Sequence, residues 1–116
     1  MQPEQKDAAL LWDIKQAAED IIDFVKGMEV HQFESNKVVR YAVERQILVI
    51  GEAAKSISDS LKEGHPEIPW SAIIGQRNII AHEYGDIMVE RIWLLAVGHI
   101  PELLKQIEPL IPASPE

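Results

Sequence analysis

Arg77, His82 and Tyr84 are the residues of this chain whose types and spacing best suit chemistry. They lie between Gly75 and Gly85, in the stretch Gly-Gln-Arg-Asn-Ile-Ile-Ala-His-Glu-Tyr-Gly. Arginine is a permanent cation whose planar fork of donors fits a phosphate, and histidine titrates near neutral pH and can transfer a proton. The combination indicates chemistry at a phosphodiester. A structural role stays open as an alternative, since such side chains near a helix end often cap carbonyls or fill an interface.

The motif also has characteristic flanks. Pro69-Trp70 precedes it, Ile92-Trp93 follows it, and the segment Gly51-Glu-Ala-Ala-Lys55 lies upstream. With these flanks the chain, from about Leu10 to Leu104, resembles the HepT-like branch of the HEPN superfamily. The resemblance implies a small all-α protein that dimerises, cleaves RNA without a metal ion as a toxin, and is silenced by a nucleotidyltransferase antitoxin of the MntA type.

The spacing of Arg77 and His82 favours a site built by two chains. On an ideal helix the two residues differ by about 140° in direction and about 7.5 Å along the axis, so they do not share one narrow face. Two motifs that face each other across a two-fold axis would line a cleft with two arginines and two histidines. By resemblance, the family uses this arrangement.

Each motif residue has a distinct expected role. RNA supplies its own nucleophile, the 2′-hydroxyl, so His82 suits proton transfer and Arg77 suits stabilisation of charge on the phosphorane-like transition state. Asn78 could orient Arg77 or a phosphate oxygen, or it could be a solvated helix residue. By resemblance Tyr84 accepts AMP from the antitoxin, which would place negative charge beside Arg77 and His82 and block RNA. A structural aromatic at the interface is the alternative for Tyr84.

We expect no metal and no cofactor. The other histidines, His31, His65 and His99, lack partners at metal-ligand spacing. The glycines that flank the motif form no phosphate-binding loop, because no Gly-x-x-x-x-Gly-Lys string is present.

Composition sets the expected compartment and partners. The 116 residues contain no cysteine, and we find neither a leader-like N-terminus nor a run of about 20 apolar residues, so we expect a cytoplasmic protein without a membrane segment. The net charge of −8 argues against broad affinity for nucleic acid, and we expect no DNA binding. A local basic cluster could still bind RNA. Its candidates are Lys37, Arg40, Arg45, Lys55, Arg77 and Arg91.

The elements that position the motif are expected to be helices. Apolar residues recur at intervals of three and four over residues 7–28 and 36–62, with Asp7 and either Ser35 or Asn36 as N-caps and a polar connection over residues 29–36. A third helix is expected from Trp70 to the motif. A fourth is expected after Asp86, with Gly98 and Pro101 interrupting it. The run Ile47-Leu-Val-Ile50 makes one helix apolar on several sides, which favours a dimer.

The pattern therefore predicts an antiparallel four-helix bundle, HEPN-like and dimeric, with a kinked C-terminal helix. We expect one domain over residues 1–108 and a flexible, proline-rich tail over residues 109–116.

The leading functional hypothesis is the toxin of a type VII-like toxin-antitoxin system. It is a metal-independent endoribonuclease with a composite Arg77/His82 site at a homodimer interface, neutralised by AMPylation of Tyr84 by an MntA-like nucleotidyltransferase. A second hypothesis is a non-catalytic HEPN scaffold that regulates or carries the nucleotidyltransferase. A third is a plain helical oligomer without an active cleft.

Overall fold

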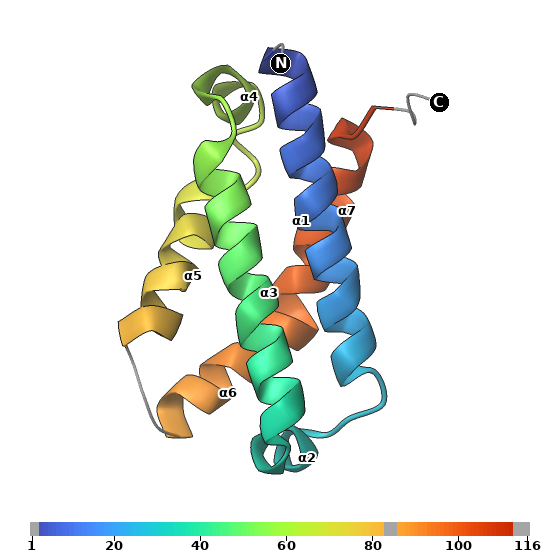
Figure 1. The fold of residues 1–116 in the computed structure, drawn as a ribbon, viewed down its shortest axis with the longest axis vertical. Helices are drawn as coiled ribbons and strands as arrows, with labels where there is room; N and C mark the ends of the chain where they lie inside the picture. The colour runs from blue at the N-terminus through green and yellow to red at the C-terminus, as the bar shows by residue number, and fades with distance from the viewer. Residues whose placement is uncertain (1–2, 83–85, 113–116) are drawn as a thin grey trace.

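The chain folds into helices that lie side by side (Figure 1). The computed structural model describes the backbone of residues 3–82 and 86–112 and the side chains of residues 5–76 and 89–112. No strand occurs in these backbone ranges, so the all-α prediction is confirmed. The elements are α1 (Pro3–Val25), α2 (Val30–Ser35), α3 (Lys37–Ser56), α4 (Asp59–Gly64), α5 (Trp70–His82), α6 (Asp86–Leu94), a π-helical turn η1 (Leu95–His99), α7 (Ile100–Ile107) and a 3-10 turn η2 (Glu108–Leu110).

The long helices run antiparallel to their neighbours. α3 packs between α1 and α5, and the C-terminal unit of α6, η1 and α7 crosses behind α3 to pack on α1 (Figure 1). The start of α1 and the end of α7 lie at one end of the bundle. The start of α3, with α2 and α6, lies at the other. This agrees with the predicted four-helix bundle, and dimerisation stays a prediction.

The first helix begins and ends earlier than predicted. It spans Pro3–Val25, so Asp7 is an interior residue and our assignment of Asp7 as its N-cap was wrong. Gly27, which we expected in the last turn, follows the helix with φ of 77°, a backbone angle that suits glycine at a helix C-terminus. The expected connection over residues 29–36 contains α2, where Glu29 and Gln32 form a capping box.

The second predicted helix is divided in two. Asn36 caps its start, as predicted, because the Asn36 side chain accepts a hydrogen bond from the Val39 amide at 3.1 Å. The helix ends at Ser56 instead of continuing to residue 62. The Asp7 carboxylate accepts hydrogen bonds from the Ser58 amide at 2.9 Å and the Ser58 hydroxyl at 2.5 Å. Asp7 therefore holds Ser58, which caps the start of α4 by accepting a hydrogen bond from the Leu61 amide at 3.3 Å.

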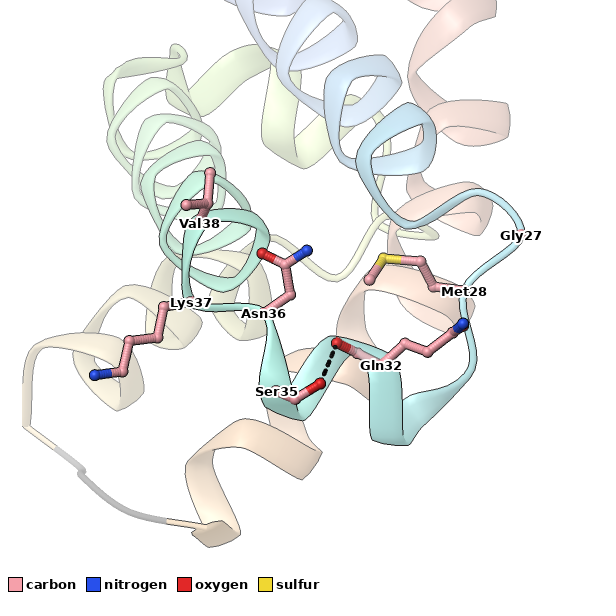
Figure 2. Close-up of a pocket in the computed structure, with 7 residues that line it drawn as sticks. All are labelled: Gly27, Met28, Gln32, Ser35, Asn36, Lys37 and Val38. Carbon is pink, nitrogen blue, oxygen red and sulfur yellow. Dashed lines mark hydrogen bonds between the residues drawn. The ribbon is translucent and has the colours of Figure 1, made fainter.

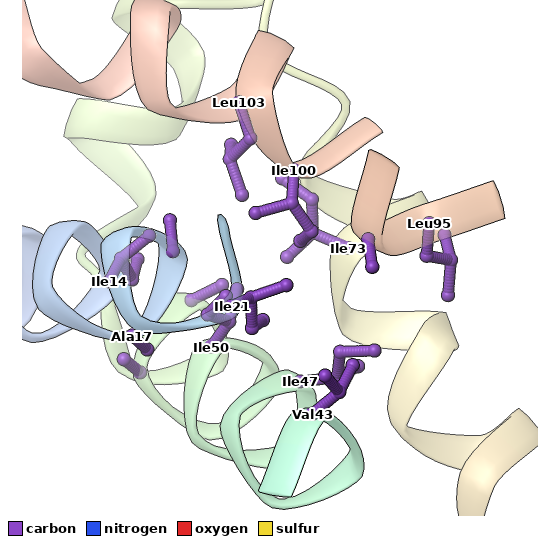
Figure 3. Packing of buried hydrophobic residues seen from close by; sticks show 14 of the residues in the cluster. Ile14, Ala17, Ile21, Val43, Ile47, Ile50, Ile73, Leu95, Ile100 and Leu103 are labelled. Carbon is purple, nitrogen blue, oxygen red and sulfur yellow. The ribbon is translucent and has the colours of Figure 1, made fainter. Parts of the chain in front are cut away.

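Branched aliphatic side chains dominate the core (Figure 3). Ile14 and Ile21 of α1 meet Ile47 and Ile50 of α3, and all four are at most 1% exposed. Burying one such side chain contributes about 1.5–3 kcal/mol. Within the run over residues 47–50, Ile47 and Ile50 are thus used inside one chain, whereas Leu48 and Val49 are only partly buried, and the inference of a dimer from this run stays a prediction. The most exposed large apolar residue of α3 is Val38, at 79%.

The C-terminal helix is interrupted where the sequence predicts. Pro101 has no amide hydrogen, and its ring would clash with the carbonyl of Val97 in a regular α-helix. The π-helical turn relieves this conflict, since the Ile100 amide donates to the carbonyl of Leu95, five residues back. Beyond α7, Leu110 and Ile111 lie partly buried against the core. The packed part of the chain therefore continues past residue 109, where we expected the tail to start.

Candidate functional site

Arg77, Asn78 and His82 lie in the last two turns of α5, which is a continuous α-helix through His82. The ideal separation of Arg77 and His82, about 140° and about 7.5 Å, therefore applies to their backbone positions. The side chains of these three residues, and Tyr84 as a whole, lie outside the described residues. The contacts among the four predicted site residues stay predictions.

The start of α5 is firmly anchored. The Trp70 indole donates a hydrogen bond to the carbonyl of His65 at 3.1 Å, and Trp70 is only 8% exposed. Ile73, one turn later, is buried in the core. These contacts of the N-terminal half fix the orientation of α5, and with it the position of the motif at the other end of the helix.

The motif-bearing end of α5 points to the end of the bundle where α3 begins. Because α5 runs antiparallel to α3, its last turns lie beside the N-terminal half of α3, and α6 then starts near α2 (Figure 1). α3 contacts both α5 and α6. The N-terminal half of α3 therefore lies next to α5, the helix that carries Arg77, Asn78 and His82.

Some of the predicted cations gather at this end. Lys37 and Arg40 belong to the first turn of α3, Arg45 is about one turn further along, and Arg91 is on α6. Lys55 is in the last turn of α3, about 27 Å from Lys37 along the helix axis, so it does not join them. Lys37, Arg40 and Arg45 thus belong to the N-terminal half of α3, and whether the candidate cations form one basic cluster stays a prediction.

Arg40 and Glu44 form a partly buried pair of charges that sequence reasoning did not single out. Burial raises the pKa of the Glu44 carboxyl, and the positive charge of Arg40 opposes this rise. The Arg40 guanidinium carbon lies 5.9 Å from the centre of the Tyr41 ring. The i, i+4 spacing of Arg40 and Glu44 is the signal that could have drawn attention to them.

The histidines outside the motif have ordinary surroundings. His31 lies 3.4 Å from the carboxylate of Glu29, and His65 lies 3.3 Å from that of Glu67. Among the residues whose side chains are described, no group of three or more His, Cys, Asp or Glu residues could hold a metal ion. His82 and Glu83 are not among these, so metal independence stays a prediction.

Two grooves are lined by residues whose side chains the structure describes. An open groove of about 660 Å³ follows the connection from α1 to α3, where the Ser35 hydroxyl donates to the carbonyl of Gln32 at 3.2 Å (Figure 2). A second groove, of about 490 Å³, is lined by Glu19, Asp20 and Asp23 of α1 and by Leu104 of α7. Its carboxylates would repel a phosphate, so it is unsuited to RNA. Within the described ranges, no helix is long and apolar enough to cross a bilayer.

Comparison with known proteins gives consistent matches. A family model described as "Ribonuclease HepT-like" matches residues 14–110. "Putative RNase MJ1380" of Methanocaldococcus jannaschii is 37% identical over 100 residues, which cover 86% of this chain and 92% of that protein. "Putative RNase MJ1216" of the same organism is 38% identical over 109 residues, covering 94% and 90%. "Probable ribonuclease HepT" of Thermococcus cleftensis is 35% identical over 100 residues, covering 86% and 91%. No solved structure matches significantly.

Proposed function

The chain belongs to the HepT-like ribonuclease family, and from this premise we propose that it is a metal-independent endoribonuclease, the toxin of a type VII-like toxin-antitoxin system. The observation that carries the proposal is the intact Arg-Asn-x-x-x-His-x-Tyr string, whose first six residues occupy the last two turns of α5. The names of the relatives support ribonuclease activity. The toxin role, the catalytic residues and the antitoxin partner are proposals.

In the proposed reaction the RNA supplies the nucleophile. The 2′-hydroxyl loses its proton and attacks the adjacent phosphorus, the bond to the 5′-oxygen of the next nucleotide breaks, and that oxygen gains a proton. His82 serves these proton transfers because its ordinary pKa lies near neutral pH. Arg77 donates hydrogen bonds to the phosphate oxygens, where negative charge accumulates in the transition state. Asn78 supports Arg77 by orienting it or a phosphate oxygen.

The site is completed by a second copy of the chain. Arg77 and His82 point in directions about 140° apart on α5, so one helix cannot place both groups around one phosphate at close range. In a homodimer with two-fold symmetry, Arg77 of one protomer and His82 of its partner would flank the same phosphate.

Tyr84 is the proposed site of control. An MntA-like nucleotidyltransferase would transfer AMP from ATP to the Tyr84 hydroxyl and release pyrophosphate. The added phosphate would occupy the position of the RNA phosphate and repel the strand. With that enzyme and ATP, we expect the wild-type chain to gain the mass of one AMP and lose cleavage activity, and Tyr84→Phe to gain no mass. Modification of Tyr84→Phe to the same extent would overturn this assignment.

A scaffold that only binds the nucleotidyltransferase is the second candidate. The net charge of −8 favours it, since an acidic surface suits a basic protein partner better than a polyanion.

One substrate pair tests the proposed reaction. The unmodified protein should cut a labelled RNA but not the DNA of the same sequence, because DNA lacks the 2′-hydroxyl. The RNA fragments should end in a 2′,3′-cyclic phosphate and a 5′-hydroxyl. Equal cleavage of both strands, or fragments with 5′-phosphates, would contradict the mechanism.

A further inference from the structure

The Arg40 side chain has a buried nitrogen for which the described residues provide no hydrogen-bond acceptor. Its Nε is buried, and it has no hydrogen-bond partner among the residues that the structure describes. The side chain as a whole is only half-buried, so the rest of it can reach solvent. A buried donor without a partner is costly, and a ligand is one of the explanations for such an atom in a native structure.

The direction in which Arg40 leaves α3 can be inferred from its helical row. Arg40, Glu44 and Ile47 follow one another at intervals of four and three residues, so they lie within about 60° of one another around the helix, and Arg40 and Ile47 differ by about 20°. Ile47 projects toward α5 and the C-terminal helical unit (Figure 3). Arg40 therefore leaves α3 on the side that faces α5, near residues of the core such as Val43.

The N-terminal half of α3, which contains Arg40, has α5 and α6 as neighbours (Figure 1). Arg40 is in the first turn of α3, and its amide donates to the carbonyl of Asn36 at 3.0 Å. α3 contacts α5 and α6, which lie on one side of its first turns (Figure 1). Lys37, in the same turn, extends toward that side (Figure 2). Lys37 and Arg40 thus lie on the helix that packs against α5, and α5 carries Arg77 and His82.

The surroundings of Arg40 restrain its guanidinium. The Tyr41 ring lies 5.9 Å from the guanidinium carbon, and Glu44 is one turn further along the helix. Such contacts reduce the number of conformations that the long side chain would lose on binding a ligand. A restrained guanidinium fork suits a phosphate oxygen pair better than a mobile ammonium does.

We propose that Arg40 is a phosphate-binding residue of the RNA site, which contacts the strand next to the phosphate held by Arg77 and His82. The proposal rests on the proposed ribonuclease function. Arg40 holds the strand and takes no part in proton transfer. The site would then be built by α3 as well as by the motif on α5.

The test measures RNA binding separately from cleavage. The probe is a fluorescein-labelled RNA oligonucleotide in which every ribose is 2′-O-methylated, so that it has no nucleophile. The full chain is compared with Arg40→Gln, Arg40→Lys and the control Lys55→Gln, which removes one positive charge from the opposite end of the same helix. Fluorescence anisotropy gives Kd at several salt concentrations, and cleavage of unmodified RNA is measured in parallel.

We expect Arg40→Gln to weaken binding about tenfold and to reduce the slope of log K against log salt by about 0.7, the loss of one contact to a single-stranded phosphate. Arg40→Lys should keep the salt slope but bind several-fold more weakly, because it keeps the charge and loses the fork. Lys55→Gln should change Kd less than about twofold. If Arg40→Gln does not fold, the Kd of Arg40→Lys, compared with that of wild type, still tests whether Arg40 contacts a phosphate.

Two outcomes would overturn the inference. If wild type cleaves RNA and all three variants bind the probe equally well, Arg40 is not a phosphate contact, and the ribonuclease proposal stands. If wild type neither binds the probe nor cleaves RNA, while intact mass shows Tyr84 unmodified, both proposals fail.

Discussion

At the scale of single residues, the sequence points to Arg77 and His82 on α5, whereas the structure adds Arg40 and Glu44 on the neighbouring helix α3. Arg77 and His82 could be predicted from the sequence because a phosphodiester needs a cation and a proton-transfer group, and the motif places both within six residues. The sequence offered Arg40 only as one of six candidate cations, and it offered Glu44 only through its i, i+4 spacing to Arg40. Their importance depends on burial and on the packing of α3 beside α5, which are properties of the folded chain.

Glu44 leads to a prediction about pH. Burial raises its pKa in the folded protein, and Arg40 only partly offsets this effect. A carboxyl with a raised folded-state pKa contributes stability below its unfolded pKa, and this contribution is lost as pH rises through the folded value. Glu44→Gln should therefore gain stability relative to wild type as pH rises from about 4 to 7, by less than about 1 kcal/mol because solvent reaches the group.

Urea denaturation of both proteins at several pH values measures the difference. Other titrating groups affect wild type and variant alike, so their contributions cancel. A Glu44→Gln protein that becomes less stable than wild type as pH rises would show that pairing with Arg40 outweighs burial.

At the scale of elements, hydrophobic periodicity predicted which segments are helical but not where they break. The stripe of apolar residues continues from α3 into α4, so the pattern alone reads as one helix over residues 36–62. At this break Ser58 is held by Asp7, which lies 51 residues from Ser58 in the chain and is adjacent to it in the fold. The contact with Asp7 leaves no local signal, and the one local sign of the break is Ser58 itself, a residue type that favours helix starts. Pro101 breaks its helix through its own ring, and the sequence therefore predicted that interruption.

Asp7 is accordingly expected to be important for stability. Asp7→Ala should lower the free energy of unfolding by about 1–3 kcal/mol, because it leaves the Ser58 amide and hydroxyl without their charged acceptor. The matched control is Asp13→Ala, an exposed aspartate of the same helix, which should change stability by less than about 0.5 kcal/mol. Urea denaturation compares the three proteins. Equal losses in the two variants would show that the Asp7–Ser58 contact does not stabilise the fold.

At the scale of the whole molecule, the account requires two chains. The motif residues diverge around α5, and the protein as a whole carries a net charge of −8, so one chain alone offers a phosphate few cations near the motif. The apolar stripes of the sequence predicted the helical bundle. Dimerisation depends on whether the surfaces of two chains are complementary in shape and charge, and the periodicity of one chain carries no information about that.

A mixed dimer tests the composite site. Arg77→Ala and His82→Ala homodimers should each lose at least about 100-fold in cleavage rate. A dimer of one Arg77→Ala chain and one His82→Ala chain, isolated through two different affinity tags, keeps one intact Arg77/His82 pair across the axis and should regain activity. Mixed dimers as inactive as their parents would place the pair within one protomer or remove it from catalysis.

The most direct test of the central claim is cleavage of labelled total RNA and tRNA in excess EDTA. Wild type, with intact mass confirming an unmodified Tyr84, is compared with His82→Ala purified in the same way. The account predicts that wild type cuts and that His82→Ala does not. Equal cleavage by both proteins, or by neither, would contradict a metal-independent ribonuclease that depends on His82.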